Sequence, residues 1–96
     1  MSEIVRIASV EPVLYGVVKI VWKDGYEAMV DLRPVIAEGD MFSFLRETAD
    51  RFRGVQIAEA GHAIFWLDDT GDEIGFSSNA LRERAERQAE ILRLAS

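Results

Sequence analysis

Alternating apolar and polar positions run through the first third of the chain. This alternation predicts three β-strands, over Ile4–Val10, Val13–Trp22 and Tyr26–Leu32, because successive side chains of a strand point to opposite faces. We expect Pro12 to break the pattern after the first strand, since proline cannot donate to a strand ladder. Pro34 follows the third strand and is expected to end it.

The turn between the second and third strands sets which side chains share a face. A two-residue loop of Asp24 and Gly25 would pair Trp22 with Glu27 and mix acids with apolar residues on one face. A three-residue loop that begins at Lys23 separates the two classes, so we predict this loop, with Gly25 in the left-handed conformation. One face then carries Val18, Ile20, Trp22, Tyr26, Ala28 and Val30.

Helical spacing replaces the alternation in the middle of the chain. Asp40 is a candidate helix cap, Thr48 is expected to restart the chain as a second short turn, and Gly54 to end the element. The apolar residues at this spacing are Met41, Phe42, Leu45, Ala49 and Phe52. One or two short helices are therefore predicted after the third strand.

Further strands and a longer helix are predicted in the second half. The strands are Val55–Glu59, Ala63–Leu67 and Glu73–Phe76, with an acidic turn before the last one. Ser77 and Ser78 are good caps for a helix that continues to the end of the chain. Its expected apolar stripe contains Leu81, Ala85, Gln88 and Leu92, and its expected charge pairs are Glu83–Arg87 and Arg82–Glu86.

Together these elements predict an α+β fold. We expect an antiparallel β-meander of about five to six strands, one or two short helices and a C-terminal helix. The length of 96 residues suits one domain, with residues 1–82 as the α+β body and residues 83–96 as a helical extension of it. The chain has no cysteine, which excludes disulfides and thiolate metal sites.

Charge and the N-terminal segment narrow the possible environments. The net charge of −6 disfavours a phosphate backbone as a general partner. The first residues carry an acid at Glu3 and no long apolar run, so we expect neither a signal peptide nor a membrane helix, and a cytoplasmic protein. No cofactor-binding motif is present, and we expect no cofactor.

Few polar groups are candidates for chemistry. Asp31 and Arg33 lie on the polar side at the end of the third strand, where we favour a solvated strand end over a binding site. The chain's single histidine, His62, has no adjacent nucleophile and is interpreted as a turn residue. The best metal candidate is the group Asp68, Asp69 and Asp72, although a solvated hairpin tip explains these acids more simply.

Contact with a partner is a more promising hypothesis. Trp66 would be a plausible anchor if it is exposed, which the neighbouring Phe65 leaves open. Ile91 and Leu94 widen the apolar surface at the end of the last helix, and Arg84 and Arg87 are part of its base-rich segment. Because glutamates alternate with the arginines, we favour a protein partner or self-association over direct nucleic-acid binding.

The order of several short motifs resembles a known family. The runs VWKDGYEAMVDLRP, FSFL, RFRGVQI, IFWLD and GDEIGFSSNALR, between Ile4 and Arg82, resemble the bacterial domain of unknown function 2442. The resemblance implies a small α+β fold with a curved antiparallel sheet, and no agreed activity or catalytic residues. Some relatives look like members of toxin–antitoxin-type gene pairs, and some continue into a helix-turn-helix, which we do not expect here.

We therefore expect a non-catalytic protein-interaction module, for which the resemblance implies a regulatory or antitoxin-like role. Two alternatives stay open. One is a nucleic-acid-associated regulator that uses the C-terminal helix, and the other is a small metal-binding protein at the acidic turn.

Overall fold

The computed structural model describes residues 5–95, and the predicted strand residue Ile4 lies outside them. Within this range the chain forms an α+β fold, as predicted, with six strands in two three-stranded antiparallel sheets. The strands are β1 (Ile7–Leu14), β2 (Val17–Trp22), β3 (Glu27–Asp31), β4 (Gln56–Ile57), β5 (Ala63–Leu67) and β6 (Glu73–Ser77). The helices are α1 (Arg33–Ile36), α2 (Ser43–Glu47), α3 (Ala49–Phe52), the 3-10 turn η1 (Glu59–Gly61) and α4 (Ser78–Ala95).

The predicted register of β2 and β3 is confirmed. Ile20 lies opposite Ala28, and the Trp22 amide donates to the Tyr26 carbonyl across the loop at 2.8 Å. Gly25 has φ +94°, the left-handed conformation that this three-residue loop requires. The apolar face that the register creates packs into the core, where Val18, Ile20, Trp22 and Val30 are all buried.

The prediction that Pro12 ends the first strand is wrong. β1 continues through Pro12 to Leu14, and the chain reverses before Val17 rather than at the proline. β1 is an edge strand with register shifts beside Ile7 and Pro12, and an edge or a bulge is where a sheet tolerates a residue without an N–H.

The short helices differ in detail from the prediction. Thr48 separates α2 from α3 in an extended conformation (φ −146°), as expected. Asp40 does not cap α2 with its side chain; instead its carbonyl accepts a hydrogen bond from the Ser43 hydroxyl at 2.9 Å. A further helical turn, α1, starts directly after β3, because Pro34 at its beginning needs no amide partner there.

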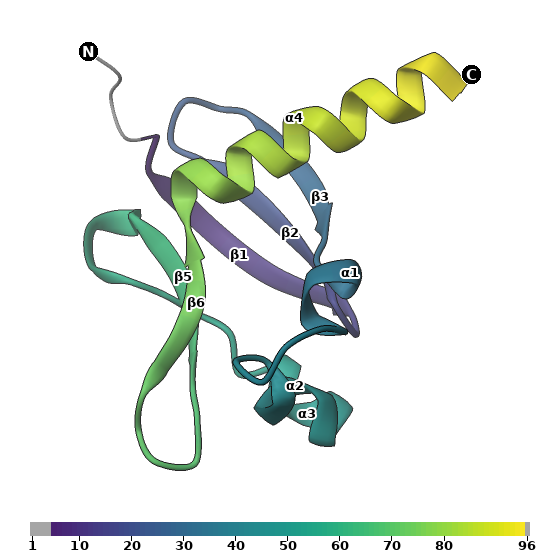
Figure 1. Ribbon diagram of the computed structural model, residues 1–96. Coiled ribbons are helices and arrows are strands. Elements are labelled where there is room, and N and C mark those ends of the chain that lie inside the picture. The colour runs from purple at the N-terminus through teal and green to yellow at the C-terminus, as the bar shows by residue number, and fades with distance from the viewer. Residues whose placement is uncertain (1–4, 96) are drawn as a thin grey trace.

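The core lies between the two sheets and under α4. Trp22 from β2 and Trp66 from β5 are each 1% exposed, and Phe52 of α3 stacks at a tilt against Trp66 with ring centroids 5.4 Å apart. In Figure 1, α4 crosses the β1–β3 sheet, while the β5–β6 hairpin and the short helices close the other sides.

Helix α4 begins at the predicted caps. The Ser77 hydroxyl oxygen accepts a hydrogen bond from the Ala80 amide at 3.1 Å, which is N-cap geometry. Leu81 and Ala85 of the predicted stripe are buried, but Leu92 is 72% exposed. The helix runs unbroken through residue 82, so the predicted domain boundary falls inside α4.

Candidate protein-interaction surface

An open groove lies between strand β3 and helix α4. Its volume is about 550 Å³. β3 contributes Ala28 and Met29 to its lining, and α4 contributes Ala89, Ile91 and Leu92. Most of this lining is apolar, and Met29 is 60% exposed although it lies in a strand. The groove therefore offers an apolar surface along one open edge of a sheet.

Gln88 holds α4 against the end of β3. Its side-chain amide donates to the Asp31 carbonyl at 2.9 Å, and its side-chain oxygen accepts a hydrogen bond from the Asp31 amide at 3.1 Å. The Gln88 side chain thus occupies the position that a neighbouring strand would take at Asp31. Gln88 was predicted to lie on the helix stripe, whereas its contact with Asp31 was not predicted. A polar residue on an otherwise apolar stripe is the signal that was available.

Asp31 and Arg33 form the polar end of the groove. The Arg33 guanidinium donates to both carboxylate oxygens of Asp31, at 2.9 and 2.8 Å, and the Arg33 amide donates to one of them at 3.0 Å. The hydrogen bonds from the Arg33 side chain lower the pKa of Asp31, and the charge of Arg84 adds to this shift. The pair is a strand-end ion pair, and it lines the same groove as Ile91, one of the predicted contact residues.

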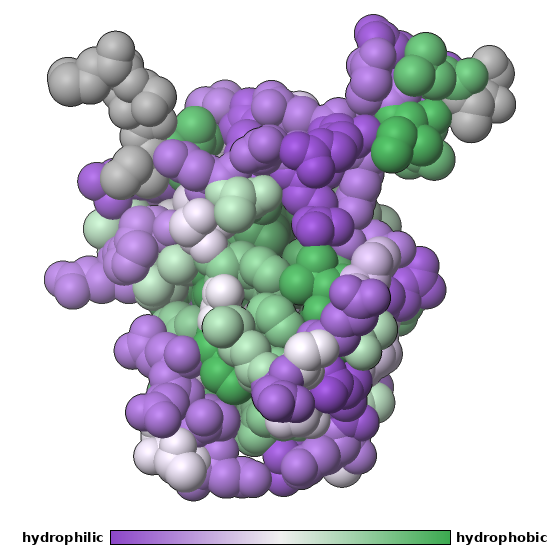
Figure 2. All heavy atoms as spheres, in the orientation of Figure 1, coloured by the Kyte–Doolittle hydropathy of each residue, from purple (hydrophilic) through white to green (hydrophobic). Residues whose placement is uncertain are grey.

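The last turns of α4 project beyond the sheet. Ile91, Leu92 and Leu94 are 59%, 72% and 75% exposed, the last two being the highest exposures among the large apolar residues described. Figure 2 shows apolar surface among polar atoms at the upper right, where the end of α4 extends beyond the body of the molecule. Of the predicted contact residues, Ile91 lines the groove, while Leu94 is exposed but does not line it.

The arginines of α4 are mostly neutralised by neighbours. Arg87 pairs with Glu83 at 2.9 Å, and Arg82 pairs with Asp24 at 3.0 Å while lying 4.0 Å from the centroid of the Tyr26 ring. Arg84 and Arg87 border a smaller hollow of about 230 Å³, which also includes Val35 and Phe76. Because carboxylates accompany these cations, α4 does not present the cleanly positive face of a nucleic-acid helix.

Trp66 does not form part of this surface. It is 1% exposed, and its indole N–H donates to the carbonyl of Phe52 at 2.8 Å. Trp66 was proposed as a partner contact on the condition that it is exposed, and because it is buried this prediction is wrong. β5 pairs Trp66 with Ile74 of β6 and turns it inward, whereas Phe65 occupies the other face.

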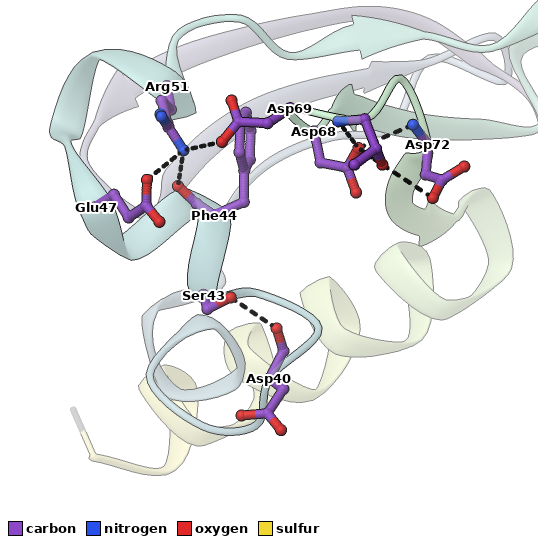
Figure 3. Close-up of polar contacts among 9 residues, drawn as sticks. Asp40, Ser43, Phe44, Glu47, Arg51, Asp68, Asp69 and Asp72 are labelled. Carbon is purple, nitrogen blue, oxygen red and sulfur yellow. Dashed lines mark hydrogen bonds and ion pairs between the residues drawn. The ribbon is translucent and has the colours of Figure 1, made fainter.

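The carboxylates of the acidic turn have hydrogen-bond or ion-pair partners within the protein. One oxygen of Asp68 accepts hydrogen bonds from the amides of Thr70 and Asp72, each at 2.9 Å, and from the Thr70 hydroxyl at 2.7 Å. These bonds, chiefly the one from the Thr70 hydroxyl, lower the pKa of Asp68. Figure 3 shows that the Asp69 carboxylate points toward Arg51 and not toward Asp68 and Asp72. A guanidinium nitrogen of Arg51 lies 3.5 Å from an Asp69 carboxylate oxygen and also forms an ion pair with Glu47.

This geometry does not support the predicted metal site at Asp68, Asp69 and Asp72. In the part of the chain that the structure describes, no three histidine or carboxylate side chains are arranged to hold an ion. His62 follows η1, and one of its ring nitrogens lies 2.6 Å from the Glu59 carbonyl, consistent with its predicted place in a turn. Among residues 5–95, no helix has both the length and the apolarity needed to span a bilayer.

Comparisons of the chain with protein-family models, curated proteins and solved structures gave no match. The resemblance to the domain of unknown function 2442 accordingly remains a prediction from its motifs.

Proposed function

We propose that this chain is a non-catalytic protein-interaction module that docks through the β3–α4 groove and the projecting end of α4. The observation that carries the proposal is the exposure of Ile91, Leu92 and Leu94 beside an apolar groove of about 550 Å³. Exposed apolar surface of this extent is costly in water unless another protein covers it. A regulatory, antitoxin-like role, which the family resemblance implies, and a place in the cytoplasm, which the N-terminal sequence suggests, belong to the same proposal.

The polar groups of the chain support a binding role rather than catalysis. Asp31, Asp68 and Asp24 are held by hydrogen bonds from neighbouring residues, and each has a lowered pKa. A carboxylate held in its charged form is a poor general acid–base catalyst near neutral pH, because catalytic groups titrate close to the working pH. These groups therefore order turns and strand ends around the surface.

A pair of charge-matched double variants tests the proposal. Ile91→Glu with Leu94→Glu places two carboxylates on the projecting end of α4, and we expect it to abolish association as measured by light scattering. Val13→Glu with Leu14→Glu is the control, because these residues are also exposed, at 44% and 53%, but lie in β1. Equal masses for the two variants and the unmodified chain would contradict the proposal.

Nucleic-acid binding through α4 is the alternative, and Arg84 beside Arg87 is the observation that favours it. It predicts binding that weakens steeply with salt and is lost on Arg84→Ala with Arg87→Ala. Titration of a short duplex at low salt measures this directly.

A further inference from the structure

We propose that the β3–α4 groove receives strand β3 of a second copy of this chain, so that the two β1–β3 sheets join into one antiparallel sheet. The inference rests on the proposed function and names the occupant of its surface. Its starting point is that β3 is the outer strand of its sheet and lines the groove. An outer strand presents unpaired backbone groups that another strand can bind.

The hydrogen bonds of β3 show which backbone groups are unpaired. The Trp22 amide bonds to the Tyr26 carbonyl, and the Leu32 amide bonds to the Gly16 carbonyl at 2.7 Å. In an antiparallel pair, residues alternate between bonding to the neighbouring strand and pointing away from it. The odd-numbered residues Glu27, Met29 and Asp31 therefore turn their N–H and C=O groups away from β2.

Asp31 is already capped, which limits the free edge to two residues. The Gln88 side chain bonds to both backbone groups of Asp31. Among residues 5–95, no residue forms a hydrogen bond to the backbone groups of Glu27 and Met29 on this side. The free edge thus consists of two donors and two acceptors on residues two apart.

This short edge is complementary to itself. A two-fold axis at Ala28 places Glu27 of one copy opposite Met29 of the other, and each such pair exchanges two hydrogen bonds. All four free groups of each copy are then satisfied, and the capped Asp31 is left outside the pairing. Closed two-fold contacts of this kind are the commonest in homo-oligomers.

The opposite edge of the same sheet is protected against such pairing. β1 contains Pro12 and two register shifts, and it contacts β4 and η1. Gly61 of η1 packs so closely on β1 that an added Cβ would lie 2.4 Å from the Ile7 carbonyl oxygen. Proline and bulges are the usual protection of edge strands, and β3 has neither between Glu27 and Asp31.

The projection of α4 is long enough to pass over one added strand. After Gln88 the helix continues to Ala95. At about 1.5 Å per residue these seven residues extend roughly 10 Å, whereas neighbouring strands are about 4.8 Å apart. Figure 1 shows this end of α4 passing beyond β3 on the open side. Ala89 and Leu92 are then in position to cover the strand contributed by the second copy.

Charge gives the pairing a distinctive salt dependence. The register places Glu27 diagonally across from Glu27 of the second copy, and each copy has a net charge of −6. Like charges on diagonal neighbours oppose pairing, so added salt and Glu27→Gln should both strengthen the dimer.

A cysteine trap tests the register, because the chain has no cysteine of its own. In the proposed dimer the two Ala28 residues form a pair without hydrogen bonds, with Cα atoms about 4.5 Å apart, which a disulfide can bridge. Under mild oxidation we expect Ala28→Cys to form covalent dimer on the order of tenfold faster than Met41→Cys, because pairing raises the local concentration of the thiols. Met41 is 66% exposed and lies outside β3, so its cysteine reports random collision.

A double variant, Ala28→Cys with Met29→Pro, tests whether cross-linking depends on the free edge of β3. The Met29 amide points away from β2, so proline leaves the β2–β3 ladder intact while it removes a donor from the free edge. We expect the double variant to stay folded by circular dichroism and to cross-link no faster than Met41→Cys. Cross-linking of Ala28→Cys at the rate of Met41→Cys, or cross-linking unaffected by Met29→Pro, would overturn the inference. Loss of association in Ile91→Glu with Leu94→Glu, together with cross-linking unaffected by Met29→Pro, would uphold the proposed function and overturn the β3 pairing alone.

Discussion

At the scale of single residues, Ser78 joins three parts of the fold. Its side chain is fully buried at the start of α4. The hydroxyl oxygen accepts a hydrogen bond from the Trp22 indole N–H at 3.1 Å, and the hydroxyl donates to the carbonyl of Val5. One hydroxyl therefore satisfies the buried indole N–H of Trp22 and the partly buried carbonyl of Val5.

We predict that Ser78→Ala lowers the free energy of unfolding by about 1–3 kcal/mol, because it leaves a buried donor and an acceptor without a partner. Urea denaturation measures the change. Ser43→Ala is the control, since the Ser43 hydroxyl bonds at an exposed position and its loss should cost well under half as much. Equal costs for the two variants would contradict this account of Ser78.

Gly75 is required by packing rather than by its backbone angles. An added Cβ would lie 2.0 Å from the Ile64 carbonyl oxygen on the paired strand β5. We predict that Gly75→Ala prevents or severely weakens folding, whereas Gly54→Ala is tolerated because its nearest neighbour lies at 3.4 Å. Thermal unfolding of both variants measures the difference in their midpoint temperatures. A Gly75→Ala chain as stable as the Gly54→Ala chain would contradict the close spacing of β5 and β6 at this residue.

Asp31 should contribute to acid sensitivity. Hydrogen bonds from the Arg33 side chain lower its folded-state pKa below the ordinary value of 3.8. A lowered carboxyl pKa adds stability above the unfolded-state value, and this stability is lost as pH falls through the folded-state value. Asp31→Asn should therefore flatten the fall in stability below about pH 4, measured by urea denaturation at pH 7 and pH 3. An unchanged slope would contradict the role of the ion pair.

At the scale of elements, the sequence predicted those features that neighbouring residues determine. The β2–β3 register followed because a shift of one residue would have moved Trp22 away from Tyr26 and mixed acids with the core face. The extent of β1 did not follow, since Pro12 is acceptable only on an edge strand, and position in a sheet is not a local property. The orientation of Trp66 likewise depended on its pairing with β6.

The β3–α4 groove was beyond sequence reasoning for the same reason. Asp31, Arg33 and Ile91 were each identified, but from strands and helices considered separately. What brings them together is the pairing of Gln88 with the backbone of Asp31 across 57 positions of the chain. A contact of this range is fixed by the packing of α4 on the core, which the helical stripe alone does not specify.

Helix α4 should divide energetically into a docked half and a projecting half. We predict that Leu81→Ala, at a residue only 1% exposed, costs about 2–5 kcal/mol of unfolding free energy because it leaves a cavity. Leu92→Ala, at a residue 72% exposed, should change the stability of a dilute sample by less than about 0.5 kcal/mol. Denaturant unfolding at low protein concentration measures both. A large cost at Leu92 would place the end of α4 against the body of the same chain.

At the scale of the whole molecule, the chain is a small scaffold whose core is covered except along one edge. The two tryptophans, the short helices and the first half of α4 enclose the interior. The edge of β3 and the end of α4 are left with unpaired backbone groups and exposed apolar side chains. The docking of a second copy that we propose would cover both features at once.

Sedimentation equilibrium of the unmodified chain over a wide range of concentrations tests this central claim most directly. With increasing protein concentration, we predict that the average mass rises from the 10.8 kDa of one chain toward twice that value. Added salt should shift this rise to lower protein concentrations. A mass of 10.8 kDa at every concentration and salt level would contradict it.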